Sequence, residues 1–215
     1  MSFIMYNWVS ILIPFFIGIY RYKHLDKSLR LFLYFVVYGT VTEIVSRIVI
    51  RYGLIIYNGE TNTLPITHLY LLAEFLILGL FYSHILKDIL QKRVIITLVV
   101  LFVVYCIINT LFLQSIFTYA AFPHALSKIL LVGFSILFFY KVMIDASIPN
   151  LWKEPLVYIN LAVLIYYSGS LFYSLLFNVI LDYSREFAKV TNYYFAALNT
   201  LFYILVAIGF WKSDR

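Results

Sequence analysis

Seven stretches of the chain are almost continuously apolar, and each is close to the ~20 residues that a helix needs to cross a bilayer. They cover residues 3–20, 31–50, 66–86, 94–113, 124–144, 156–180 and 191–211. Short polar segments separate them, and the longest, 51–65, contains the turn signal Asn58-Gly59. The pattern predicts an all-α integral membrane protein, with residues 1–215 forming one bundle of seven transmembrane helices.

The composition agrees with a lipid environment. Hydrophobic residues make up 64% of the chain and charged residues 12%, with a mean hydropathy of +0.94. Soluble domains are about 45–50% apolar and about 25% charged, so this chain could not cover itself with polar groups in water. A single cysteine, Cys106, excludes an intrachain disulfide and a cysteine-based zinc site. No cofactor is indicated.

The basic residues predict how the bundle lies in the membrane. Of 16 Lys and Arg residues, 11 fall on one side of the predicted spans, three on the other and two within spans. The positive-inside rule therefore places the N-terminus outside and the C-terminus in the cytoplasm. The net charge of +6 favours contact with anionic membrane lipids, and no separate basic domain is present that would bind nucleic acid.

Four charged residues interrupt the apolar spans: Glu43, Arg47, Glu74 and Lys128. A charged side chain at the bilayer centre costs at least ~2.5–3.5 kcal/mol, so such groups are expected to face the bundle interior. Glu43 and Arg47 are four residues apart and share one helix face. The two acids and two bases cancel in charge.

Further polar residues mostly fall in the outer half of the spans, which predicts a polar chamber there between spans 2, 3, 5, 6 and 7. Span 4, 94–113, is the most apolar and is expected at the periphery. The predicted ligand-binding residues are Glu43, Arg47, Tyr70, Glu74, His124, Lys128, Tyr167, Asn178, Asn192 and Asn199.

Two interpretations of this polar set stay open. The charges could form an interhelical network that only fixes helix packing. They could also bind a polar or zwitterionic ligand, with Arg47 or Lys128 holding its anionic group and Glu43 or Glu74 its cationic group. A metal site would draw on His68, His124 and Glu74, but no span has two histidines four residues apart, and the nearby bases would repel a cation.

Two segments of the chain are alike. Residues 66–75 and 190–199 align without gaps, so that Thr67 meets Thr191, Tyr70 meets Tyr194 and Ala73 meets Ala197. Both spans run in the same predicted direction. The alignment predicts a 3+1+3 arrangement of two parallel repeats, with the fourth span as the linker.

Residues 62–83 read NTLPITHLYLLAEFLILGLFYS, and the residues Asn62, His68, Tyr70, Glu74 and Phe75 carry a resemblance. This stretch, about a tenth of the chain, resembles a segment of small uncharacterised seven-span proteins of Bacteroidota-type bacteria. The resemblance implies a bacterial inner membrane protein and brings no established activity with it.

The leading functional hypothesis is a membrane sensor or receptor-like module. It would bind a small polar, zwitterionic or lipid-headgroup ligand in the outer chamber and signal through a separate cytoplasmic protein. The alternatives are a small-solute transporter or channel, and an intramembrane lipid-acting enzyme that uses His68, His124 and a carboxylate. No catalytic residue is assigned, and the sequence sets no oligomeric state.

Overall fold

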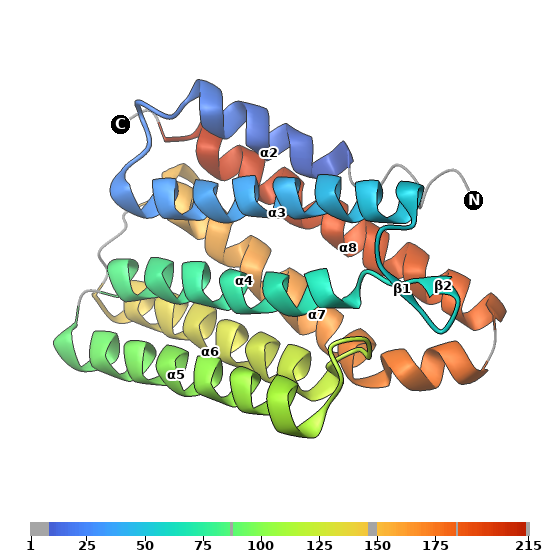
Figure 1. Ribbon diagram of the computed structural model, residues 1–215. Coiled ribbons are helices and arrows are strands. Elements are labelled where there is room, and N and C mark those ends of the chain that lie inside the picture. The colour runs from blue at the N-terminus through green and yellow to red at the C-terminus, as the bar shows by residue number, and fades with distance from the viewer. Residues whose placement is uncertain (1–8, 87, 146–149, 184, 214–215) are drawn as a thin grey trace.

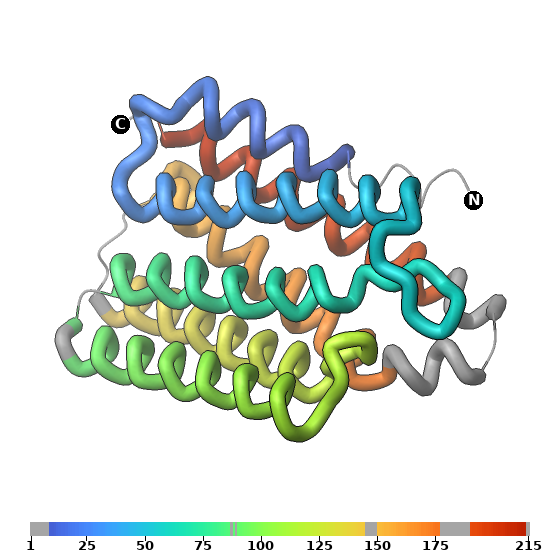
Figure 2. Tube along the Cα trace, in the orientation of Figure 1, coloured from blue at the N-terminus to red at the C-terminus, as the bar shows by residue number. Residues whose placement is uncertain are grey.

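The computed structural model describes the backbone of residues 9–86, 88–145, 150–183 and 185–213. Within these ranges, the side chains of residues 89, 145, 177–183 and 185–189 are not described (Figure 2). Within these ranges the protein is all-α apart from one two-stranded hairpin (Figure 1). The helices are α2 (Val9–Tyr20), α3 (Lys27–Tyr52), α4 (Leu64–Ile85), α5 (Ile89–Ile108), α6 (Ala121–Asp145), α7 (Pro155–Tyr183) and α8 (Arg185–Trp211). The shorter elements are β1 (Ile56–Tyr57), β2 (Glu60–Thr61), the π-helix η1 (Asn109–Leu113) and the 3-10 helix η2 (Leu151–Lys153).

Six of the described helices, α3 to α8, are long and apolar enough to cross a membrane, with η1 extending α5. The predicted first span is represented by α2, which has 12 residues. At about 1.5 Å per residue it is ~18 Å long, shorter than the ~30 Å hydrocarbon layer. The prediction of seven full-length spans is therefore replaced by six long helices and a shorter one, and residues 3–8 of the predicted span lie outside the description.

Polar residues extend the helices beyond the predicted apolar stretches. The span predicted at 94–113 begins at Ile89, because the carboxylate of Asp88 accepts a hydrogen bond from the Leu90 amide at 3.0 Å. The carboxylate of Asp26 caps α3 in the same way, 2.8 Å from the Leu29 amide. An apolar run marks the segment of a helix that crosses the lipid layer, whereas a capping residue marks where the helix begins.

The predicted turn at Asn58-Gly59 is confirmed. These residues connect β1 to β2, where Tyr57 pairs with Glu60. Asn58 has φ 51° and Gly59 has φ 82°, and two successive positive φ angles are typical of a tight hairpin turn. Gly53, with φ 59°, ends α3 just before the hairpin.

The helices pack in a closed order around a common core. Helix α3 packs against α2 and α4, α4 against α6, α6 against α7, α7 against α8, and α8 against α2 (Figure 1). Helix α5 lies outside this ring against α4 and buries the smallest share of its residues among the six long helices. Gly79 allows that approach, since a Cβ there would lie 2.3 Å from Val99 Cγ2. The peripheral position expected for span 4 is confirmed.

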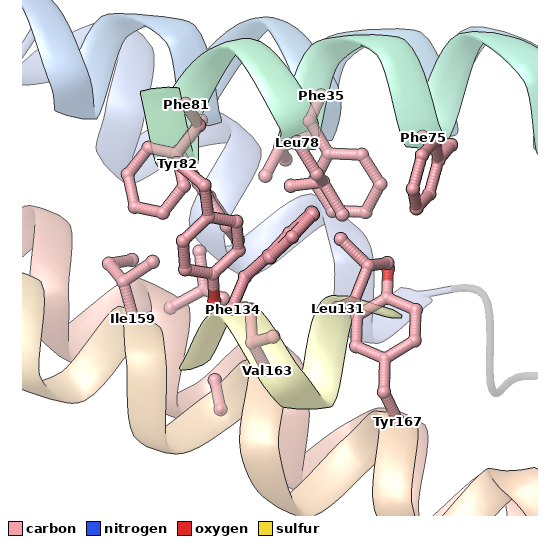
Figure 3. Close-up of a cluster of buried hydrophobic side chains, with 14 of the residues drawn as sticks. Phe35, Phe75, Leu78, Phe81, Tyr82, Leu131, Phe134, Ile159, Val163 and Tyr167 are labelled. Atoms are coloured by element: carbon pink, nitrogen blue, oxygen red, sulfur yellow. The ribbon is translucent and has the colours of Figure 1, made fainter. Parts of the chain in front are cut away.

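Side chains from α4, α6 and α7 fill the centre of the bundle. Phe75, Leu78 and Tyr82 project from α4 toward Phe134 of α6 and Val163 of α7 (Figure 3). The rings of Tyr82 and Phe134 are 5.5 Å apart. Because these helices are far apart in sequence, the core connects the two halves of the chain.

The two ends of the bundle differ in charge. One end, here called the basic end, carries the loops after α2, α4 and α6 and the end of α8 (Figure 1). Its described basic residues are Arg21, Lys23, Lys27, Arg30, Lys92, Arg93, Lys141, Lys153 and Lys212. Trp152 and Trp211 also lie there, and Arg21 Nη2 donates to Trp211 O at 2.8 Å. The opposite end, here called the hairpin end, carries β1, β2 and the 114–120 loop.

Candidate ligand-binding site

A polar cavity of about 340 Å³ lies in the half of the bundle nearer the hairpin end. Its wall comes from α3, α4, α6, α7, α8 and the loop before α6. The lining residues are Glu43, Thr67, Tyr70, Glu74, Tyr119, His124, Lys128, Tyr166, Tyr167, Tyr173, Ser174, Phe195, Asn199 and Tyr203. Seven of the ten predicted binding residues are therefore brought together: Glu43, Tyr70, Glu74, His124, Lys128, Tyr167 and Asn199.

Glu74 forms the acidic part of the buried wall. Its side chain comes from the middle of α4, and the residue is only 6% exposed. Glu74 Oε1 accepts hydrogen bonds from the hydroxyls of Tyr167 at 2.7 Å and Tyr70 at 3.3 Å. Two hydroxyl donors from α4 and α7 thus fix the carboxyl group in place.

Lys128 forms the basic part of the same wall. It lies two turns into α6, is 7% exposed, and its ammonium donates to Ser170 O at 3.1 Å and to Ser174 Oγ of α7. The ammonium also lies 5.8 Å from the ring centroid of Phe195 in α8, a cation–π distance. A buried acid and a buried base therefore share one cavity.

Glu43 stands at the α3 side of this cavity, where a second compartment of about 150 Å³ adjoins it. Glu43, Thr67, Tyr70 and Tyr203 line both spaces. The Glu43 side chain is 49% exposed and lies 3.8 Å from Arg47, which is 43% exposed and lines neither space. The pair marks the open side of the site.

The 114–120 loop brings Tyr119 into the cavity. The ring of Tyr119 stacks on His124 at 4.7 Å with an angle of 6° between the planes, and Gln114 Nε2 donates to Tyr119 O at 2.8 Å. His68 Nε2 lies 3.0 Å from Thr118 O, so α4 also holds the loop. Burial raises the pKa of Tyr119 to about 12, which keeps its hydroxyl protonated and able to donate.

Three predicted binding residues do not line the cavity. Arg47 lies outside it, on the exposed face of α3. Asn192 lies behind the wall, where its Oδ1 accepts from the Tyr173 hydroxyl at 3.1 Å. The side chain of Asn178 lies outside the described residues.

The weak metal candidates are divided between two places. His124 and Glu74 line the polar cavity, whereas His68 lines a separate, mainly apolar pocket with Leu72 and Cys106. Among the described residues, no three His, Cys, Asp or Glu side chains come together to hold a metal ion. The residue set expected for a His68–His124 enzyme is therefore not assembled in this cavity.

Most of the cavity-lining residues that the sequence did not predict are aromatic. The additional lining residues are Thr67, Tyr119, Tyr166, Tyr173, Ser174, Phe195 and Tyr203. Tyr166 and Tyr173 are seven residues apart in α7, and Phe195 and Asn199 are four apart in α8, spacings that place each pair on one helix face. Tyr119 lies in a loop, where no such spacing exists.

Comparison with protein families, with curated proteins and with solved structures gave no match.

Proposed function

We propose that the polar cavity binds a small ligand carrying both charge signs, a free zwitterion or a lipid headgroup, and that the protein acts as a membrane sensor. The observation that carries this proposal is that Glu74 and Lys128, both nearly fully buried, line one cavity. Its volume of about 340 Å³ falls within the ~300–1,000 Å³ typical of small-molecule sites. Ionisable residues at membrane depth are costly and are usually functional.

The orientation of the bundle supports binding from outside the cytoplasm. With its basic end in the cytoplasm, the protein presents the hairpin end and the cavity to the outer side of a bacterial inner membrane. In this proposal α2 is part of a further membrane crossing, which comes first in the chain and brings the six long helices to seven spans. In the two predicted triplets, α3 packs on α2 and α4, and α7 packs on α6 and α8. The 3+1+3 repeat stays a prediction.

The cavity floor favours sensing over transport. Tyr167, whose hydroxyl reaches Glu74, has its ring 6.4 Å from Phe202, and Phe202 lies 6.4 Å from Phe32. Phe32 in turn packs against Phe81 at 5.2 Å and Phe210 at 6.4 Å toward the basic end. Aromatic packing thus continues where a permeation path would need polar groups. A ligand would instead alter helix packing, which a cytoplasmic signalling protein would detect at the basic end.

Binding of a small zwitterion to the purified protein in lipid nanodiscs tests this proposal. Phosphoethanolamine is a suitable probe, measured by isothermal titration calorimetry. The wild type is expected to bind it, and the double variant Glu74→Gln/Lys128→Met is expected to lose binding. Glu60→Gln, an exposed acid in β2, is the control. Equal binding by the wild type and the double variant would contradict the site, and protein-dependent uptake into proteoliposomes would favour transport.

A further inference from the structure

Glu43 of α3 and Lys128 of α6 line the cavity from different helices, and their opposite charges would set the orientation of a bound ligand. We infer, building on the proposed zwitterion site, that the ligand's ammonium group binds at Glu43 with Tyr70 and Tyr203, and that its anionic group binds at Lys128. The ligand class is thereby narrowed to small ammonium compounds that carry a phosphate or carboxylate group.

The Lys128 pole has the properties of an anion site. Two of the three N–H donors of the ammonium are directed to Ser170 O and Ser174 Oγ, which leaves one for a ligand. The hydroxyl of Tyr166 and the amide of Asn199 line the same cavity, and neither has a hydrogen-bond partner within the described part of the chain. The ring of Phe195 lies between the two helices' groups, 5.8 Å from the Tyr166 ring and 5.8 Å from Lys128 Nζ.

The Glu43 pole has the properties of a cation site. Arg47 is 3.8 Å from the Glu43 carboxylate, longer than the ~2.7–2.9 Å of a charge-assisted hydrogen bond, and it does not line the cavity. The compartment side of Glu43 therefore has no basic residue in its described lining. Tyr70 and Tyr203 border both spaces, and aromatic rings attract an ammonium ion.

The Tyr203 hydroxyl is a second indication that this compartment holds a ligand. Tyr203 is 8% exposed, yet its hydroxyl has no hydrogen-bond partner among the residues that the structure describes. The hydroxyl oxygen is not fully enclosed by protein, and Tyr203 borders the compartment, so a ligand or water there can supply the missing hydrogen bond. Glu74 Oε1 already accepts from two tyrosine hydroxyls, whereas no tyrosine hydroxyl donates to Glu43 among the described residues.

Three soluble probes separate the two poles: phosphoethanolamine carries both charges, ethanolamine only the cation, and inorganic phosphate only the anion. Their affinities are measured by calorimetry in phosphatidylglycerol nanodiscs. Glu43→Gln is expected to weaken phosphoethanolamine and ethanolamine by about tenfold or more while phosphate affinity is unchanged. Lys128→Met is expected to weaken phosphoethanolamine and phosphate to a similar extent and to spare ethanolamine.

Matched variants keep the test interpretable. Glu60→Gln makes the same chemical change as Glu43→Gln at an exposed position in the hairpin. If Lys128→Met fails to fold, Lys128→Arg retains the positive charge but replaces the compact ammonium by a larger, planar guanidinium in a site built for the ammonium, and it is expected to alter phosphate affinity and spare ethanolamine.

The results distinguish this inference from the proposal on which it rests. If Glu43→Gln has no effect, or weakens phosphate as much as ethanolamine, the assigned direction is wrong while zwitterion binding stands. If the wild type binds none of the three probes, both the inference and the proposed function fail.

A second arm identifies the source of the ligand. Phosphatidylethanolamine is added to the phosphatidylglycerol nanodiscs, and the phosphoethanolamine titration is repeated. If phosphatidylethanolamine lowers the apparent affinity of the wild type for phosphoethanolamine, and Glu43→Gln removes this competition, the assigned direction is supported with a lipid headgroup as the ligand. An unchanged affinity that still depends on Glu43 supports the same direction with a free small molecule.

Discussion

The two halves of the bundle are built from the same helices but differ in what occupies their interiors. In the half at the basic end, Phe32, Phe81 and Phe210 pack ring against ring and are fully buried. In the half at the hairpin end, Glu74 and Lys128 are almost as deeply buried but border a cavity. The three rings of the first set pack directly on one another, whereas the two charged side chains of the second set border an open cavity.

The difference shows where a membrane protein can place charge. Groups from α4, α7 and α8 surround Lys128 and Glu74 with side-chain hydroxyls, the backbone carbonyl of Ser170 and an aromatic ring. Such partners offset the cost of removing each charge from water. Further along the same helices, toward the basic end, apolar side chains fill the core, and single hydrogen bonds such as that from Ser135 Oγ to Asn160 O at 2.9 Å join neighbouring helices. We therefore expect substitutions in the two halves to affect binding and stability differently.

The largest expected effect is that of Glu74→Leu. Removing this acid leaves Lys128 buried without its counter-charge, which should lower the free energy of unfolding by about 3–5 kcal/mol. Denaturant unfolding in detergent measures it. The double variant Glu74→Leu/Lys128→Leu should recover most of the loss and still fail to bind. A double variant as unstable as the single one would show that the two charges do not compensate each other.

Leu78→Ala should have a similar or smaller effect on stability and none on binding. Leu78 is fully buried between α4 and its neighbours, so its truncation should cost about 2–5 kcal/mol. Leu80→Ala, on the exposed face of the same helix, is the control. A strong loss of phosphoethanolamine affinity in Leu78→Ala, with stability unchanged, would contradict the claim that the packed half provides stability and the cavity half provides binding.

Tyr167→Phe should have an intermediate effect. It removes the 2.7 Å hydrogen bond to Glu74, and bonds to charged groups contribute about 1.5–3 kcal/mol. Unfolding midpoints measure the change, with Tyr140→Phe as the control, because Tyr140 is 60% exposed and should shift stability by less than ~0.5 kcal/mol. Equal effects of the two substitutions would mean that the Glu74 contact contributes little.

Arg47→Gln is expected to have the smallest effect. Its contact with Glu43 is long and half-exposed, and such pairs contribute about 0–1 kcal/mol. The same unfolding assay should show little change, with Arg51→Gln in the last turn of α3 as the comparison. A loss as large as that of Glu74→Leu would place Arg47 within the buried network.

Much of the site could be predicted from the sequence because a charged side chain in an apolar span is stable only where it faces the bundle interior or a polar cavity. That argument located Glu43, Glu74 and Lys128, which line one cavity. It did not locate Arg47, because a spacing of four residues fixes a shared helix face but not which wall of the bundle that face meets. Tyr119 could not be found either, since its place depends on how Gln114 and His68 hold a loop.

The internal alignment shows the same limit. Tyr70 and Tyr194 occupy equivalent positions in the two aligned segments. Tyr70 lines the cavity and donates to Glu74, whereas Tyr194 is 53% exposed. An alignment of two helices can match their sequences, but the neighbours that each helix meets decide what its side chains do.

A structure of the protein in nanodiscs with phosphoethanolamine tests the central claim most directly. The account predicts density in the polar cavity, with the phosphate in hydrogen-bonding distance of Lys128 Nζ and the ammonium beside Glu43 and Tyr203. A cavity closed by direct contact between Glu74 and Lys128, with the probe bound elsewhere or not at all, would contradict it and leave the charges with a packing role alone.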